Sequence, residues 1–140
     1  MFQEEGSVVY LAAPQPTGVK DLTLNNFLSH VDKTKINKII YISTSGVYGD
    51  KKDQLVNERS ELTPLTDRAK RRVDAEGQII KSDIKYTILR VPGIYGKSRL
   101  PLKRIADNLP LIKKDICKHT NLINAKDCLL YTSPSPRDLS

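Results

Sequence analysis

The sequence has few of the residues that stabilise secreted or metal-binding proteins. It contains two cysteines in 140 residues, Cys117 and Cys128, which are too few for a disulfide framework and lack metal-ligand spacing. The two histidines, His30 and His119, are far apart, so the sequence predicts no metal site. No apolar run approaches the ~20 residues of a membrane helix, and the N-terminus lacks the basic and then apolar layout of a secretion signal. We therefore expect a cytoplasmic protein without a metal ion and without a membrane partner.

The seven glycines never form the G-x-G-x-x-G turn that binds the phosphates of a dinucleotide. If the fold binds a dinucleotide, we expect the segment that holds the pyrophosphate to lie outside this chain. The sequence also shows no internal repeat. Its 39% hydrophobic and 28% charged residues are typical of a globular protein, and its length has room for one modest domain.

The formal charge of +7 comes partly from two basic clusters, one at residues 68–72 and one at residues 97–104. One interpretation is affinity for phosphates, either of a nucleotide or of a nucleic acid. The other, which we favour, is a solvated helix face. Aromatic residues are not interleaved with these charges, which argues against a stacking platform for single strands. We expect no nucleic-acid partner.

Strand and helix patterns alternate along the chain. Residues 8–13, 38–43 and 86–91 are mostly apolar, and the second is rich in β-branched residues, so each predicts a buried strand. Helices are predicted at 21–34, capped by Asp21, and from Thr66 to about residue 81, with a shorter one near 100–107. The second helix should bury Ala69, Val73 and Ile80. This order predicts an α/β fold with a parallel sheet, too small to be a complete layer.

The second strand opens into a hydroxyl-rich loop, and residues 43–50 read STSGVYGD. Open α/β sheets bind ligands at the carboxyl ends of their strands, which makes these hydroxyls candidate ligand contacts. The alternative is that a buried strand is simply followed by a polar turn. The strand pattern alone leaves both interpretations open.

The last thirteen residues, 128–140, fit none of these patterns. A Ser-Pro-Ser-Pro run follows two leucines and continues neither a helix nor a central strand. One interpretation is a disordered tail. The other is that this stretch resembles the in-frame translation of a transposase-type sequencing adapter. We favour the second and expect residues 1–127 to be the native part and residues 128–140 a non-native tail.

Several segments together resemble the extended and atypical short-chain dehydrogenase/reductases, the NAD-dependent epimerase/dehydratase superfamily. The loop motif STSGVYGD resembles that family's fifth-strand motif, and LRVPGIYG at residues 89–96 resembles its sixth strand and following loop. Residues 9–14, 67–76 and 121–127 resemble, in order, its fourth strand, its catalytic helix and a late loop motif. The resemblance implies the C-terminal half of a Rossmann-like dinucleotide-binding domain, from the fourth strand onward, with a substrate region starting after about residue 97.

The resemblance also implies NAD or NADP as cofactor and a set of residues that would contact it. These are Ala12, Ala13, Pro14, Ser43, Arg72, Pro92, Gly93 and Tyr95. It further implies a small-molecule substrate and, for the full-length protein, a homodimer formed through the helices at about 21–34 and 66–81.

Only some of the family's catalytic residues have a counterpart in this sequence. The substrate-binding hydroxyl falls on Thr44, with Ser45 as a close competitor, but the Tyr-x-x-x-Lys pair falls on Arg68 and Arg72. A guanidinium stays protonated near neutral pH, so Arg68 cannot exchange a proton with a substrate. Tyr48 is the nearest replacement acid/base, although we favour a packing role for its ring. Arg90 is expected to pair with a buried carboxylate or carbonyl.

Two functions follow from the resemblance. The first is an NAD(P)-dependent oxidoreductase or epimerase-like protein of the atypical branch, acting on a small hydroxylated or nucleotide-sugar-like substrate. The second is a catalytically silent dinucleotide-binding sensor or scaffold, which the loss of the Tyr-x-x-x-Lys pair keeps open.

Overall fold

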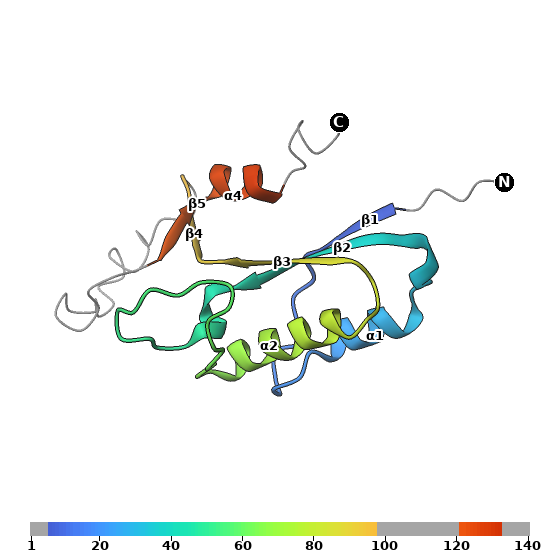
Figure 1. Cartoon of the computed structure of the whole chain (residues 1–140), viewed down its shortest axis with the longest axis horizontal. Coiled ribbons are helices and arrows are strands. Elements are labelled where there is room, and N and C mark those ends of the chain that lie inside the picture. The colour runs from blue at the N-terminus through green and yellow to red at the C-terminus, as the bar shows by residue number, and fades with distance from the viewer. Residues whose placement is uncertain (1–5, 98–120, 133–140) are drawn as a thin grey trace. The chain divides into compact units, whose positions relative to one another are not determined.

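The computed structural model describes residues 6–97 and 121–132 (Figure 1). The chain divides into two compact units, one up to Arg90 and one from Val91 onward. The short helix expected near residues 100–107 and most of the C-terminal tail lie outside the described residues.

The first unit is built on a three-stranded sheet with the order β1-β2-β3. Its strands are β1 (Gly6–Tyr10), β2 (Ile36–Thr44) and β3 (Tyr86–Val91). β1 runs parallel to β2, with Tyr10 opposite Tyr41, and the Ile39 amide donates to the Lys85 carbonyl at 2.8 Å at the start of β3. The α/β fold class with a parallel sheet is therefore confirmed.

β1 is shorter than the predicted strand at 8–13 because the chain leaves the sheet after Tyr10. The connection that follows is organised by Gln15, whose side-chain carbonyl accepts from the Leu22 amide at 3.1 Å and whose amide donates to the Lys20 carbonyl at 2.5 Å. The loop thus makes its own hydrogen bonds in place of a longer sheet ladder.

Both predicted helix starts are confirmed. α1 (Leu22–His30) begins at Asp21, whose carboxylate accepts from the Leu24 amide at 2.9 Å. α2 (Asp67–Ile80) begins at Thr66, whose hydroxyl accepts from the Ala69 amide at 3.2 Å. α1 ends earlier than the predicted residue 34, because a separate 3-10 turn, η1 (Lys33–Lys35), is capped by Asp32.

α1 and α2 lie on the same face of the sheet (Figure 1), and their apolar residues form one core with it. The buried members are Tyr10, Ile39 and Tyr41 from the strands, Leu24 and Leu28 from α1, Ala75 and Ile79 from α2, and Ile84. Ala69 is buried as predicted, but Ile80 is 52% exposed, so the predicted face of α2 was wrong by one residue at its C-terminal end.

The second unit contains a parallel pair of short strands, β4 (Gly93–Tyr95) and β5 (Leu122–Asn124), followed by α4 (Ala125–Thr132). The side chain of Asn124 accepts from the Lys126 amide at 3.0 Å, which caps the first turn of α4. α4 runs through Cys128, the residue at which the non-native tail is expected to begin.

Candidate active site

The carboxyl end of β2 carries the predicted hydroxyl cluster. Thr44 is the last residue of the strand and the cap of η2 (Ser45–Tyr48), where its hydroxyl oxygen accepts from the Gly46 amide at 3.3 Å. Thr44 and Ser45 are both partly exposed. Within residues 6–97 and 121–132 the Thr44 hydroxyl is an acceptor, and its own proton has no acceptor. That proton is therefore available to the oxygen of a bound molecule.

Ser43 points to the opposite side of β2, because successive side chains of a strand alternate between faces. It is 4% exposed, and its hydroxyl donates to the Glu76 carboxylate at 2.5 Å. The side chain of Ser43, a predicted cofactor contact, is thus directed at α2.

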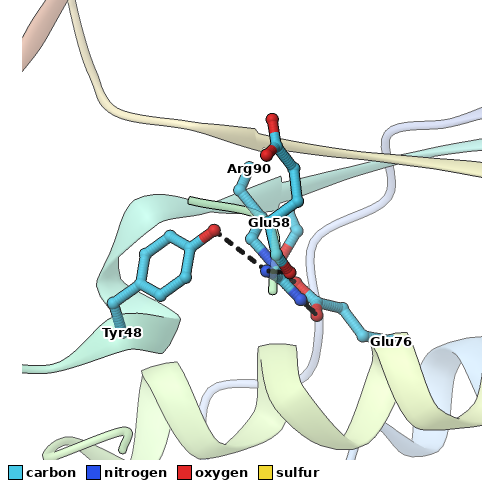
Figure 2. A network of polar contacts seen from close by, with 5 residues as sticks. Tyr48, Glu58, Glu76 and Arg90 are labelled. Atoms are coloured by element: carbon cyan, nitrogen blue, oxygen red, sulfur yellow. Dashed lines mark hydrogen bonds and ion pairs between the residues drawn. The ribbon is translucent and has the colours of Figure 1, made fainter. Parts of the chain in front are cut away.

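The Glu76 carboxylate is 2% exposed and is matched by Arg90 from β3, as Figure 2 shows. Arg90 Nη2 lies 2.8 Å from Glu76 Oε2, and Arg90 Nε lies 3.1 and 3.2 Å from the two carboxylate oxygens. A buried carboxylate needs such a partner, since an uncompensated charge inside a protein is costly. The predicted pairing of Arg90 with a buried carboxylate is present in the structure.

Tyr48 lies against the same guanidinium (Figure 2). Its hydroxyl oxygen accepts from Arg90 Nη1 at 2.9 Å, and the guanidinium carbon lies 5.1 Å from the ring centroid. The hydrogen bonds to Glu76 raise the pKa of Arg90 further above its usual range, so the guanidinium remains a charged donor. The Tyr48 ring is buried at 8% exposure, the packing arrangement favoured from the sequence.

The two arginines predicted to stand at the positions of the family's tyrosine and lysine, Arg68 and Arg72, have different surroundings. Arg68 is exposed on the first turn of α2. Arg72 reaches the sheet, where Nη1 donates to the Tyr41 hydroxyl at 2.9 Å and to the Ile42 carbonyl at 3.5 Å. Burial raises the pKa of Tyr41, although the bond from Arg72 opposes that shift. Arg72 therefore supports the sheet beneath the predicted site.

The loop after β1, which holds the predicted cofactor contacts Ala12, Ala13 and Pro14, is fixed by α2. Arg71 donates to the carbonyl of Gly18, and the Asp74 carboxylate accepts from the Asp21 amide at 2.9 Å. Ala12 and Ala13 are exposed and Pro14 is half-buried. Small exposed side chains leave the backbone of this loop open to a flat ligand.

The remaining predicted contacts belong to the second unit. Pro92 precedes β4, and the Gly93 amide donates to the Asn121 carbonyl at 3.2 Å. A Cβ at Gly93 would lie 2.8 Å from a side-chain carbon of Leu122. Tyr95 ends β4 and is 38% exposed. A side chain at position 93 would therefore overlap with Leu122, which favours glycine there, and the Tyr95 ring is accessible to solvent.

Three residues around the site, Glu76, Arg71 and Asp74, were not predicted from the sequence. All three belong to α2. Arg71 and Asp74 contact the segment that follows β1, and Glu76 contacts Ser43 within β2. One signal in the sequence could have indicated them. They are polar residues of a helix that was predicted to cover a sheet, and buried polar groups need hydrogen-bond partners.

A family model described as NAD(P)H-binding matches residues 3–119 of the chain. The chain belongs to this NAD(P)H-binding family. The match confirms the expected cofactor class, NAD or NADP. Together with solved epimerase structures, it also confirms the resemblance to the epimerase/dehydratase superfamily. A search of curated proteins finds no match.

Solved structures agree with this family. The chain is 25% identical to UDP-glucuronic acid 4-epimerase from Bacillus cereus, solved with UDP-glucuronic acid and NAD, with a TM-score of 0.64 over 79% of this chain and 39% of that one. A functionally unknown conserved protein from Silicibacter pomeroyi matches at 26% identity and TM-score 0.67, over 91% and 48%. WbmG from Bordetella bronchiseptica, solved with NAD, shares the fold at 17% identity and TM-score 0.68, over 90% and 44%. The chain spans less than half the length of these three proteins.

Two further features bear on the class of site. Among the described residues, no group of three or more histidine, cysteine or acidic side chains is arranged to hold a metal ion. No helix in the described part of the chain is long and apolar enough to cross a membrane.

Proposed function

We propose that the full-length protein binds NAD or NADP and acts as an epimerase-like oxidoreductase on a nucleotide sugar or a related small hydroxylated substrate. The single observation that carries this proposal is the Thr44 hydroxyl, partly exposed at the carboxyl end of a parallel strand with its proton free among the described residues. The family match and the likeness to a UDP-sugar epimerase support the substrate class.

The residues present suit such a cofactor. The loop at Ala12 and Ala13 follows β1 and has small, exposed side chains, and Thr44 ends β2, a parallel strand of the same sheet. When bound, the nicotinamide ring accepts or returns a hydride. Thr44 would donate its hydroxyl proton to the substrate oxygen, with Ser45 as a second donor, and would so orient the carbon that reacts.

The acid/base is the open part of this mechanism. Arg68 is exposed and permanently charged, and Arg72 is directed at Tyr41, so neither supplies the proton transfer that a tyrosine would. We assign this role to Tyr48. Its oxygen accepts from Arg90, which leaves the hydroxyl proton for a substrate oxygen, and a fixed neighbouring cation would stabilise the phenolate that forms.

A second candidate, a catalytically silent dinucleotide-binding protein, is favoured by one observation. The 8% exposure of Tyr48 is what a tyrosine with a packing role would show. Such a protein would bind the cofactor without turning over a substrate.

The experiment uses the full-length gene product, titrated with NAD(H) and NADP(H) and then assayed with UDP-glucuronic acid and UDP-N-acetylglucosamine. Cofactor binding with turnover that falls strongly in Thr44→Val and returns in Thr44→Ser supports the enzyme. Cofactor binding without turnover on a broad sugar panel favours the silent protein. Absence of cofactor binding defeats both.

A further inference from the structure

We propose that Arg90 is a positioning residue that fixes the hydroxyl turn after β2, and so sets where the Thr44 and Ser45 hydroxyls meet a ligand. The proposal rests on the proposed function for its consequence in catalysis. The restraint of the turn by Arg90 follows from contacts within the first unit and can be measured without an activity assay.

Arg90 joins three segments that are distant in the sequence (Figure 2). It contacts Glu76 on α2, the Tyr48 hydroxyl at the end of η2, and the Glu58 carbonyl at 3.2 Å in the loop that follows. One side chain from β3 therefore ties a helix, a turn and a loop together.

The two hydroxyl residues lie between two anchors on this cluster. Ser43, directly before Thr44, donates to Glu76 at 2.5 Å, and Tyr48, three residues after Ser45, accepts from Arg90 at 2.9 Å. Glu76 and Arg90 are themselves bound to each other. The segment from Ser43 to Tyr48 is thus held at both ends by one ion pair, and the geometry of its hydroxyls depends on that pair.

The chemistry of the contacts explains why an arginine occupies this position. Nε and Nη2 together hold the Glu76 carboxylate, while Nη1 of the same plane serves Tyr48 and Glu58. A planar fork with five N–H donors can serve these acceptors at once. A lysine ammonium keeps the charge beside Glu76 but cannot also bond the Tyr48 hydroxyl and the Glu58 carbonyl. Arg90→Lys therefore separates the positioning role from charge neutralisation.

The far end of the turn is fastened in a second way. The Thr63 hydroxyl donates to the Tyr48 carbonyl at 2.6 Å, and the Gly49 amide donates to the Gly46 carbonyl at 3.2 Å. The Gly49 amide is therefore a direct reporter of the turn, since its protection from exchange depends on η2 remaining closed.

The test compares amide hydrogen exchange in the full-length wild type with Arg90→Lys and Tyr48→Phe. Exchange at Gly49 should rise at least tenfold in both variants, while the amides of α1 keep their wild-type rates. Arg59→Lys is the matched control, because Arg59 is an exposed arginine of the same loop, and it should change nothing. If the enzyme turns over a sugar, kcat in Arg90→Lys should also fall on the order of 10- to 100-fold, as small misplacements of reacting groups do, with cofactor Kd unchanged. Tyr48→Phe is read by amide exchange alone, because it also removes the proposed acid/base.

The proposal is overturned if the Gly49 amide exchanges at the wild-type rate in both variants. It is also overturned if the exchange rates of the α1 and α2 amides rise as much as that of Gly49, because this would indicate a general loss of stability. If Arg90→Lys does not fold, Tyr48→Phe decides, since it leaves the Glu76–Arg90 pair intact. Failure of the wild type to bind NAD(H) or NADP(H) refutes the proposed function alone, because the exchange measurement needs no ligand.

Discussion

Substitution by alanine should be more damaging at Gly49 than at any other glycine in the described part of this chain. Gly49 has φ 69° and ψ −151°, a region of backbone space that is essentially restricted to glycine. A Cβ there would lie 2.0 Å from the Thr63 carbonyl oxygen, far inside van der Waals contact with a backbone atom. The substitution therefore combines backbone strain with an overlap that no rotamer change can relieve.

The expected cost follows from these two effects. The backbone conformation alone costs an alanine about 1–3 kcal/mol. Moving Thr63 away would also break its hydroxyl bond to the Tyr48 carbonyl, at 2.6 Å, which contributes about 1 kcal/mol. Together we expect Gly49→Ala to lower the free energy of unfolding by about 2–4 kcal/mol, a large part of the 5–15 kcal/mol typical of a protein.

Urea denaturation of the full-length protein measures this, with two glycines of the first unit as controls. Gly77 lies inside α2 with no atom within 4 Å of an added Cβ, so Gly77→Ala should raise stability by about 0.5–1 kcal/mol. Gly46→Ala meets side-chain atoms of Thr44 at an ordinary 3.7 Å and should stay within about 0.5 kcal/mol of wild type. If the urea midpoint of Gly49→Ala lies as close to the wild-type midpoint as that of Gly46→Ala does, the expected strain at Gly49 is refuted.

Two further predictions concern the helix cap and the buried tyrosines. Thr66→Ala should cost about 1 kcal/mol by removing the cap of α2, while Thr66→Ser keeps the hydroxyl and should stay near wild type in the same urea assay. Burial raises the pKa of both Tyr10 and Tyr41 in the folded state. The stability they contribute is complete below their ordinary pKa of about 10 and is lost as the pH rises above it. Urea midpoints should fall above about pH 10, less steeply in Tyr41→Phe, and an unchanged slope in that variant would exclude Tyr41 as a cause.

Local sequence signals predicted much of the fold because local chemistry determines those features. Asp21 and Thr66 were recognisable as caps since a short polar side chain before an apolar periodic run satisfies the free amides of a helix start. β3 matched its predicted bounds because an apolar run ended at proline. The end of β1 was missed, as the bonds of Gln15 that redirect the chain join residues five and seven positions apart.

The candidate site was predictable only in part. Thr44 and Ser45 were found from a motif in one stretch of sequence, and both lie at the strand end as expected. The cluster behind them was not, because Glu76 and Arg90 sit on different elements and no local pattern indicates which cation a buried carboxylate will meet. The error at Ile80 has a similar origin, since hydrophobic spacing does not decide which of two adjacent isoleucines faces the core.

The central claim is that this chain forms part of an NAD(P)-binding protein, and a calorimetric titration of the full-length gene product with NAD(H) and NADP(H) tests it most directly. We expect saturable binding of at least one of these dinucleotides at one site per chain. A folded full-length protein that shows no heat of binding and no thermal stabilisation with any of the four would contradict it.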